Sequence, residues 1–124
     1  MTKRILVVED QDDLRGVLRD LFTSSGYIVI EAADGATGIA IAKSDRPNII
    51  LMDIQMPVAD GYEATRQIKA DPDLTSIPIV AVSSFATKGD EEKARAAGCD
   101  EYVTKPYSPI QLLRMVSGYL GDKT

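Results

Sequence analysis

The chain alternates short apolar runs with longer segments in which apolar residues recur every three or four positions. The short runs are rich in valine and isoleucine, which favours strands, whereas the longer segments have the period of an amphipathic helix. Strands are predicted at residues 4–8, 27–30, 48–52, 78–82 and 101–104. Helices are predicted from the acidic segment 9–13 to the Ser24-Ser25-Gly26 segment, and then at residues 36–43, 61–70, 88–97 and 108–120.

The predicted helices differ in the apolar surface that they offer to a core. The first helix has apolar residues at intervals of three, four and seven, which form one stripe: Leu14, Val17, Leu18, Leu21 and Phe22. The last helix is expected to turn four apolar residues inward: Ile110, Leu113, Val116 and Leu120. The helix at 88–97 contains mostly alanine and charged residues, so we expect it to be held loosely.

The order of these elements predicts the fold class. Strand and helix alternate five times with short connections, which indicates right-handed crossovers and a parallel sheet. The strands are nearly continuous apolar runs, as is typical of strands covered by helices on both faces. We therefore expect an α/β fold, a three-layer doubly wound (βα)5 arrangement. The five units fill residues 1–124, so a single domain with no output domain is expected.

Composition and charge exclude several functions. Hydrophobic residues make up 44% of the 124 residues, and 14 basic and 19 acidic residues give a net charge of −5. Because no cluster of lysine and arginine occurs, the chain is not predicted to bind nucleic acid. The absence of histidine excludes histidine-dependent catalysis, histidine-bound zinc and a phosphohistidine on this chain. The single cysteine, Cys99, excludes an internal disulfide and a paired-cysteine metal site.

The N-terminal sequence bears on location. Met1-Thr2-Lys3-Arg4 leads directly into the first apolar run, without the longer apolar region of a signal peptide. No segment approaches the ~18 apolar residues that a membrane-spanning helix needs. A cytoplasmic protein with no membrane partner is therefore expected.

Polar residues follow four of the predicted strands at their carboxyl ends. They are, in chain order, Glu9 and Asp10 after the first strand, Asp53 after the third, Ser83 after the fourth and Lys105 after the fifth. Taken singly, each has an ordinary explanation, because acids favour helix starts, aspartate and serine favour turns, and lysine is usually exposed. The carboxyl ends of parallel strands meet at one edge, however, and ligands bind there. Together these residues predict a functional site.

The residue types at this predicted site favour phosphoryl transfer. Crowded carboxylates repel one another unless a cation lies among them, and oxygen ligands without nitrogen or sulfur favour Mg²⁺. A lysine and a hydroxyl beside the metal can stabilise the oxygens of a transferring phosphoryl group. If the third strand lies beside the first, Asp53 stands between the acidic pair and the Ser83–Lys105 pair, and is then the nucleophile.

These motifs, in this order, resemble the receiver domain of bacterial two-component response regulators, the CheY-like type, in its stand-alone form. Four pieces carry the resemblance over essentially the whole chain: ILVVED at 5–10, ILMDIQMPVADG at 50–61, VAVSS at 80–84 and EYVTKP at 101–106. The resemblance implies the strand order 2-1-3-4-5, which places the first and third strands side by side.

The resemblance also implies roles for individual residues. Asp53 is the phosphoacceptor, Lys105 contacts the phosphate, and Ser83 and Tyr102 are the switch residues. The lysine must turn back over the site directly at the end of its strand, and a cis bond to proline costs only ~0.5–1 kcal/mol. Together with the resemblance, this predicts a cis peptide bond between Lys105 and Pro106.

The implied metal site contains Mg²⁺. Asp10, Asp53 and the backbone carbonyl of Gln55 bind the ion directly, and Glu9 acts in its outer shell. Glu9 departs from many family members, which have aspartate at this position, but the direct ligand Asp10 is retained.

The resemblance further implies the partners. The phosphoryl group comes from a phosphohistidine on a sensor histidine kinase or a histidine phosphotransfer protein, which fits a chain without histidine. A downstream protein then binds the face formed by the fourth helix, fifth strand and last helix. The protein is a monomer or a weak phosphorylation-dependent dimer. It catalyses only phosphoryl transfer to, and hydrolysis from, its own Asp53, and is not an enzyme in the usual sense.

Two other functions remain open from the sequence. A haloacid-dehalogenase-like phosphatase also uses an aspartate at a strand end with Mg²⁺, but it needs a second aspartate two residues later, where this chain has Gln55. A degenerate receiver that acts only as a binding module would lack part of the set Asp10, Asp53, Ser83 and Lys105. A flavin carrier is disfavoured because the acidic first loop would repel a phosphate, and the glycine fingerprint of a dinucleotide-binding fold is absent.

Overall fold

The computed structural model describes residues 2–55, 61–84 and 87–121, so residues 56–60 of the ILMDIQMPVADG motif lie outside the described part. Within these ranges five strands alternate with five helices. The strands are β1 (Arg4–Val8), β2 (Ile28–Ala32), β3 (Ile49–Asp53), β4 (Ile79–Ser83) and β5 (Glu101–Thr104). The helices are α1 (Asp12–Ser24), α2 (Gly35–Asp45), α3 (Gly61–Ala70), α4 (Lys88–Ala97) and α5 (Pro109–Tyr119).

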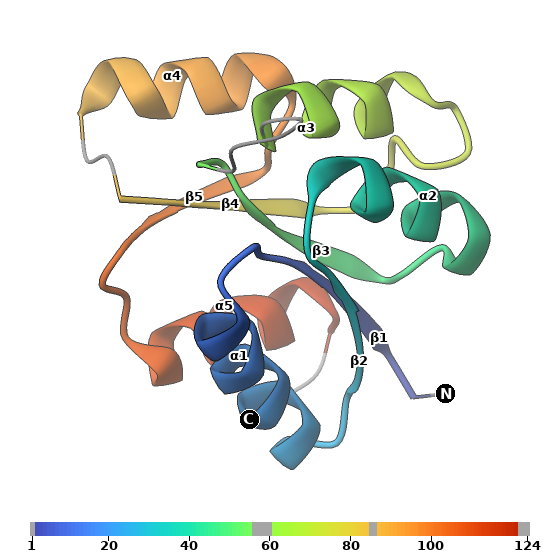
Figure 1. Cartoon of the computed structure of the whole chain (residues 1–124), viewed down its shortest axis with the longest axis vertical. Helices are drawn as coiled ribbons and strands as arrows, with labels where there is room; N and C mark the ends of the chain where they lie inside the picture. The colour runs from blue at the N-terminus through green and yellow to red at the C-terminus, as the bar shows by residue number, and fades with distance from the viewer. Residues whose placement is uncertain (1, 56–60, 85–86, 122–124) are drawn as a thin grey trace.

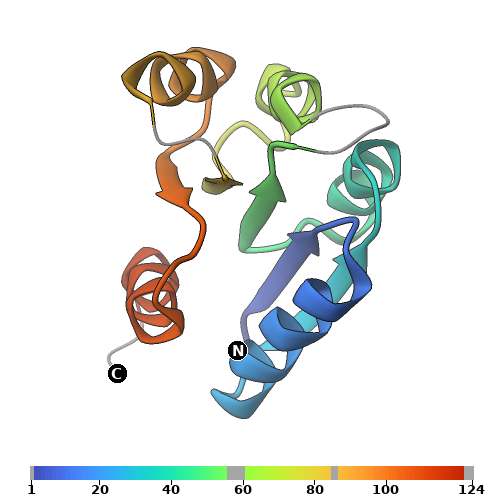
Figure 2. The same ribbon diagram turned by 60° about the vertical axis from the view of Figure 1, so that its left-hand side comes forward.

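The strands form one parallel sheet in the order β2-β1-β3-β4-β5. Helices α2, α3 and α4 cover one face of the sheet, and α1 and α5 cover the other (Figures 1 and 2). The predicted α/β fold and strand order are therefore confirmed. Because β1 lies between β2 and β3, chain direction across the sheet reverses there, and the carboxyl ends of β1 and β3 lie next to each other.

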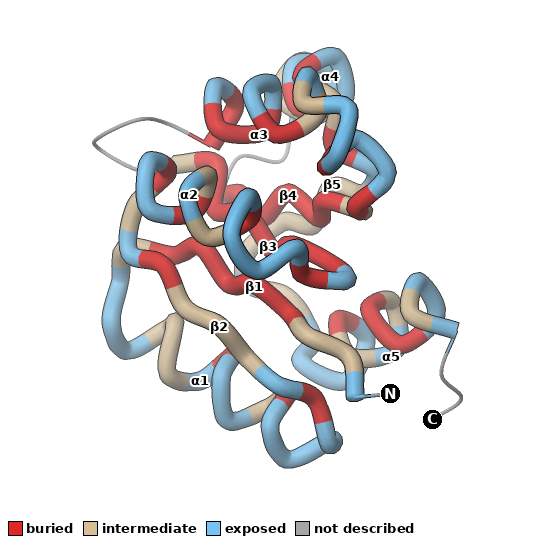
Figure 3. The backbone as a smooth tube through the Cα atoms, turned by 90° about the vertical axis from the view of Figure 1, so that its right-hand side faces the viewer, coloured by how far each residue is buried: buried red, intermediate tan, exposed pale blue. Residues whose placement is uncertain are grey.

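Alternate residues of the two central strands fill two separate cores, as the pleat of a strand requires. Towards α1 and α5, the strands contribute Ile5, Val7, Ile49 and Leu51. Towards α2, α3 and α4, they contribute Leu6, Val8, Ile50 and Met52. In Figure 3, β3 is buried along its whole length and β1 along all but its first residue. Burial of each such side chain stabilises the fold by roughly 1.5–3 kcal/mol, so the rigid sheet holds its carboxyl edge in place.

The second strand lies later in the chain than predicted. The apolar pattern indicated residues 27–30, whereas β2 spans Ile28–Ala32. The register with β1 explains the difference, because Arg4 pairs with Ile28 and Val8 pairs with Ala32. Tyr27 precedes the strand, and its buried hydroxyl lies 2.9 Å from Ser117 Oγ. The pairing partner, and not the local sequence, thus sets the end of this strand.

Two apolar side chains predicted to face inward are exposed: Val17 at 54% and Ile110 at 58%. On α5 the buried side chains include Leu112 and Val116. Ile110 lies two residues before Leu112, which is about 200° around a helix, and therefore points away from the core. The other three residues predicted to face inward on this helix do so, two of them half-buried: Val116, Leu113 and Leu120.

Helix α4 has the thin apolar face that the sequence predicted, since its buried side chains are two alanines, Ala94 and Ala97. Further contacts come from its surface, where Lys93 Nζ lies 4.4 Å from the centre of the Tyr62 ring on α3. The helix ends at Gly98, whose φ of 116° is left-handed and favours glycine. Within the described ranges, no helix has both the length and the apolar character needed to span a bilayer.

Candidate functional site

The sheet brings the predicted site residues to its carboxyl edge. Val8 pairs with Met52, so Glu9 and Asp10 emerge beside Asp53, the last residue of β3. Ser83 ends β4, and its carbonyl accepts a hydrogen bond from the Lys105 N–H at 2.7 Å. Four strands thus deliver their polar residues to one edge, as the sequence predicted.

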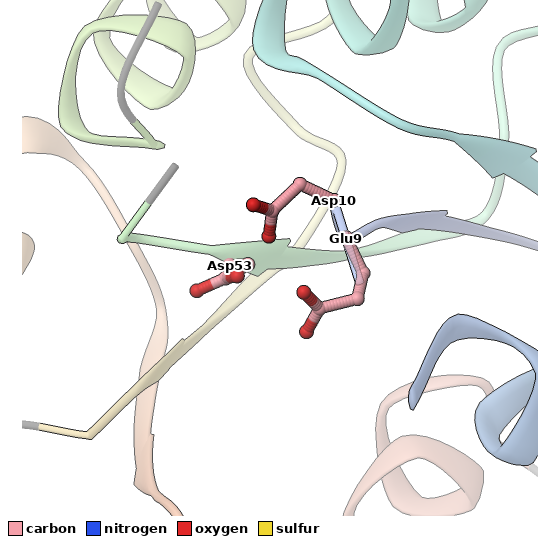
Figure 4. Close-up of side chains that lie close together, drawn as sticks. All are labelled: Glu9, Asp10 and Asp53. Atoms are coloured by element: carbon pink, nitrogen blue, oxygen red, sulfur yellow. The ribbon is translucent and has the colours of Figure 1, made fainter. Parts of the chain in front are cut away.

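Three carboxylates form the centre of the site. One oxygen from each of Glu9, Asp10 and Asp53 can be chosen so that all three lie within 4.8 Å of one another. Figure 4 shows the three side chains gathered where β1 and β3 end. Glu9 and Asp53 are 2% and 4% exposed, so two of the acids are withdrawn from water. Three hard oxygen donors at this spacing fit a divalent cation such as Mg²⁺.

Lys105 supplies a positive charge to this cluster. Its Nζ donates to Glu9 Oε1 at 3.3 Å and lies 3.6 Å from Asp53 Oδ2. The Lys105–Pro106 peptide bond is cis, as predicted. The lysine is therefore shared between two buried acids, and its stronger contact is with Glu9.

The loop after β3 is attached to the site by Gln55. Its backbone N–H donates to Asp53 Oδ1 at 3.0 Å, and its side-chain Oε1 accepts from the Ser84 N–H at 2.7 Å. The resemblance implied a metal-binding role for the backbone carbonyl of Gln55. The side-chain contact with Ser84, which links the loops after β3 and β4, was not predicted. Helix α3 begins in direct contact with the end of β3. A Cβ on Gly61, its first residue, would lie 2.3 Å from the Asp53 carbonyl oxygen, so this position has room only for glycine.

The two predicted switch residues lie on neighbouring strands. Ser83 is fully buried at the end of β4, and it pairs in register with Thr104. Tyr102 pairs with Ala81, is half-buried, and packs against the core under α2, α3 and α4. Tyr102 thus lies on β5 two residues before Thr104, the register partner of Ser83.

The pKa of the Glu9 carboxyl is raised to about 7. Burial is the largest cause, and a hydrogen bond with Asp53 and the charge of Asp53 act in the same direction. The Gln11 N–H, which donates to Glu9 Oε2 at 3.2 Å, and the charge of Lys105 oppose the shift. In the metal-free protein, Glu9 therefore changes its charge near neutral pH.

This shift predicts a pH-dependent stability. Because the folded pKa of about 7 exceeds the ordinary value of 4.5, the stabilising contribution is complete below pH 4.5 and is lost as the pH rises through 7. The loss amounts to about 3 kcal/mol. Urea unfolding in EDTA at pH 5 and pH 8 should therefore show wild type losing most of this stability relative to Glu9→Gln. Equal pH dependence of the two proteins would contradict a raised Glu9 pKa.

Two residues that the sequence did not indicate also lie at the site. Arg15, on the first turns of α1, donates from Nη1 to the backbone carbonyl of Glu9 at 2.8 Å. Tyr107 has a buried hydroxyl without a hydrogen-bond partner in the described part of the chain, and burial together with the charges of Glu9 and Asp53 raises its pKa to about 12. No sequence signal singled them out, because each acts through a contact between distant elements.

The site geometry agrees with a family comparison. The family model described as the response regulator receiver domain matches residues 5–117. The chain therefore belongs to the response regulator receiver domain family, and it is a receiver of two-component signalling. The acidic cluster of Glu9, Asp10 and Asp53 fits the phosphoaspartate and Mg²⁺ chemistry of such a domain.

Individual relatives agree with this assignment. The chain is 42% identical over 122 residues to the polar-differentiation response regulator DivK of Brucella ovis, a match that covers 98% of this chain and 99% of the relative. DivK of Brucella melitensis biotype 1 matches to the same extent.

Solved structures give the same result. A receiver domain of a sensor histidine kinase from Pseudomonas aeruginosa, with a magnesium ion coordinated in its active-site cleft, is 36% identical with a TM-score of 0.90, and the match covers 98% of this chain and 100% of that one. The chemotaxis protein CheY4 of Vibrio cholerae is 25% identical with a TM-score of 0.91, over 96% of this chain and 99% of that one.

Proposed function

We propose that Asp53 accepts a phosphoryl group from a partner phosphohistidine. The observation that carries this proposal is the pair of contacts around the Asp53 carboxylate. Lys105 Nζ lies 3.6 Å from its Oδ2, and Glu9 and Asp10 provide oxygens within 4.8 Å. A buried carboxylate with a lysine on one side and a place for a divalent cation on the other is equipped to attack phosphorus.

Mg²⁺ is the cofactor of this proposal. Asp10 and Asp53 would bind it directly with the Gln55 backbone carbonyl, and Glu9 would act from the outer shell, since its carboxylate is already held by Lys105 and the Gln11 N–H. The bound ion would offset the negative charge of the phosphoryl oxygens. Three carboxylates supply hard oxygen ligands, which make the site suited to this ion.

The transfer itself exchanges one bond at phosphorus for another. An Asp53 carboxylate oxygen forms the new O–P bond while the P–N bond to the donor imidazole breaks, and the imidazole leaves with the electron pair. Lys105 and the Ser83 hydroxyl would contact the phosphoryl oxygens. Hydrolysis later returns the Asp53 carboxylate when water attacks phosphorus and inorganic phosphate leaves. Catalysis is thus limited to the protein's own aspartate.

The phosphodonor is proposed to dock beside Lys105. A groove of about 490 Å³ lies between α1 and the connection from β5 to α5, and Leu14, Val17, Pro106 and Tyr107 line it together with Lys105. The exposure of Val17, at 54%, leaves an apolar surface that the donor protein can cover. A sensor histidine kinase or a histidine phosphotransfer protein is the proposed donor.

Phosphorylation is proposed to switch a different face. It adds roughly −1.5 to −2 charge beside Lys105 and Ser83. Ser83 then moves to donate its hydroxyl to the phosphoryl group, and Tyr102 rotates into the space that Ser83 leaves. Helix α4 shifts because its buried side chains are only two alanines, which anchor it weakly. A downstream protein binds the α4–β5–α5 face, and the phosphate selects a conformation by its differential affinity for the two states.

A stable phosphoryl mimic tests this function. NMR spectra of the protein with Mg²⁺ and beryllofluoride should show shifts from Asp53 through Ser83 to Tyr102 and residues 88–97. Ser83→Ala should confine the shifts to the metal site, because the hydroxyl that carries the change is gone. Shifts that stay local in wild type, or that spread across α1 and α2, would contradict the switch.

The competing functions have less support. For a dehalogenase-type phosphatase, Gln55 stands where the general acid is needed, and its side chain is bound to the Ser84 N–H at 2.7 Å. A binding-only receiver has no need for the retained set of acids, lysine and serine, and the beryllofluoride experiment separates it from the proposed function. The receiver is accordingly not a conventional enzyme.

The wider setting of the protein forms part of the proposal. We propose that residues 1–124 form one receiver domain, and the match to DivK of Brucella ovis, which covers 98% of this chain and 99% of that relative, supports this. The protein is proposed to act in the cytoplasm, without membrane or nucleic acid, as a monomer or as a weak dimer formed on phosphorylation.

A further inference from the structure

Arg15 is bound to three elements around the acidic pair. Its Nη1 donates to the Glu9 backbone carbonyl at 2.8 Å, and its Nε donates to Glu31 Oε1 of β2 at 3.2 Å. Its Nη2 donates to Asp12 Oδ1 at 2.6 Å, in the first turn of α1. The side chain is 17% exposed, so this guanidinium is largely enclosed by its partners.

The bond to Glu9 fixes the peptide that joins the two acids. The Glu9 carbonyl belongs to the planar peptide unit whose nitrogen is that of Asp10. On its other side, the Glu9 N–H donates to the Ala32 carbonyl at 3.0 Å. Both peptide units flanking Glu9 are therefore held, one by the neighbouring strand and one by Arg15. The orientation of the second unit sets the direction in which Asp10 leaves the backbone.

The remaining contacts of Arg15 hold the guanidinium in that position. Glu31 pairs in register with Val7, two residues before Glu9, so the sheet fixes the distance between Glu31 and the Glu9 carbonyl. Asp12, in the first turn of α1, accepts from Nη2 of the same guanidinium. A planar guanidinium can serve three acceptors in fixed directions, which a lysine ammonium on a flexible chain cannot reproduce.

We propose that Arg15 is a positioning residue of the metal site, which it serves by orienting the Glu9–Asp10 peptide and not by its charge. The inference rests on the proposed function of Asp10 and Asp53 as Mg²⁺ ligands. The two possible effects of Arg15 have opposite signs. As a nearby cation it would weaken Mg²⁺ binding, so its removal would tighten binding, whereas loss of the orientation would weaken binding.

The test compares Arg15→Lys and Arg15→Met with the control Arg19→Met. Arg19 is on the same helix and its Nη1 lies 3.6 Å from Glu31 Oε2, but it is 49% exposed and its other ion pair is with its neighbour Asp20. The control therefore removes a positive charge and a Glu31 contact without touching the acidic pair. Mg²⁺ affinity is measured by calorimetric titration, and the metal-free amide resonances of residues 9–11 are compared by NMR.

Both Arg15 variants should bind Mg²⁺ about tenfold more weakly, the size usual for an outer-shell contact. Both should also shift the metal-free Asp10 amide resonance, whereas Arg19→Met should change neither property. Tighter binding by Arg15→Met with unchanged binding by Arg15→Lys would overturn the inference in favour of a charge effect. Unchanged affinity and unchanged Asp10 resonances in both variants would overturn it as well. Failure of wild type to bind Mg²⁺ would instead contradict the proposed function, and the metal-free resonances would still decide the role of Arg15.

Discussion

Mg²⁺ binding is expected to weaken about 100-fold, or ~2.7 kcal/mol, when Asp10 is replaced by alanine. The reason is that Asp10 offers a carboxylate oxygen to the cluster. In the proposed site, its loss would leave Asp53 as the one carboxylate that binds the ion directly. Calorimetric titration with Mg²⁺ measures the effect, and competition between Mg²⁺ and Mn²⁺ for the site serves as a second readout.

Glu9→Gln is the matched comparison. Glu9 is bound by Lys105 at 3.3 Å and by the Gln11 N–H at 3.2 Å, so its carboxylate is already partly neutralised within the protein. Glutamine keeps the shape and removes the charge, and we expect Mg²⁺ affinity to fall by about tenfold or less, as for an outer-shell residue. A larger loss in Glu9→Gln than in Asp10→Ala would mean that the two acids have exchanged roles.

The contact between Glu9 and Lys105 shows where the lysine lies before Asp53 is phosphorylated. Lys105 Nζ is nearer to Glu9 Oε1, at 3.3 Å, than to Asp53 Oδ2, at 3.6 Å. A lysine that is to contact a phosphoryl group on Asp53 therefore has to weaken its bond to Glu9. Lys105 Nζ needs to move only a small distance for this, because it already lies within 4 Å of both carboxylates.

The centre of this site could be predicted because its residues stand at strand ends, which the apolar runs locate in the sequence. Glu9, Asp53 and Lys105 each follow an apolar run, and alternation of strands and helices requires those runs to be parallel. Their carboxyl ends must then meet at one edge, whatever the details of the loops. The same reasoning predicted the α/β fold from the spacing of the apolar runs.

Other features could not be predicted because they depend on contacts between distant elements. The limits of β2 follow from its register with β1, and local pattern placed the strand at 27–30 instead of Ile28–Ala32. The sequence pattern predicted Ile110 to be a core residue, but the rotation of α5 about its axis leaves this side chain exposed. The contacts of Arg15 with Glu9 and of Gln55 with Ser84 depend on side-chain direction, which no spacing rule gives.

The second large effect is expected at Asp53 itself. Asparagine has the shape of aspartate and can still accept the Gln55 N–H, which donates to Asp53 Oδ1 at 3.0 Å. It lacks the anionic oxygen that attacks phosphorus, so phosphorylation should be abolished while the fold is kept. Asp20→Asn is the control, because the Asp20 side chain lies on α1 and is 75% exposed.

The central claim is tested most directly by the intact mass of the protein after incubation with acetyl phosphate and Mg²⁺. Wild type and Asp20→Asn should gain the mass of one phosphoryl group, EDTA should prevent the gain, and Asp53→Asn should show none. Equal labelling of Asp53→Asn and wild type would contradict the assignment of Asp53 as the phosphoacceptor.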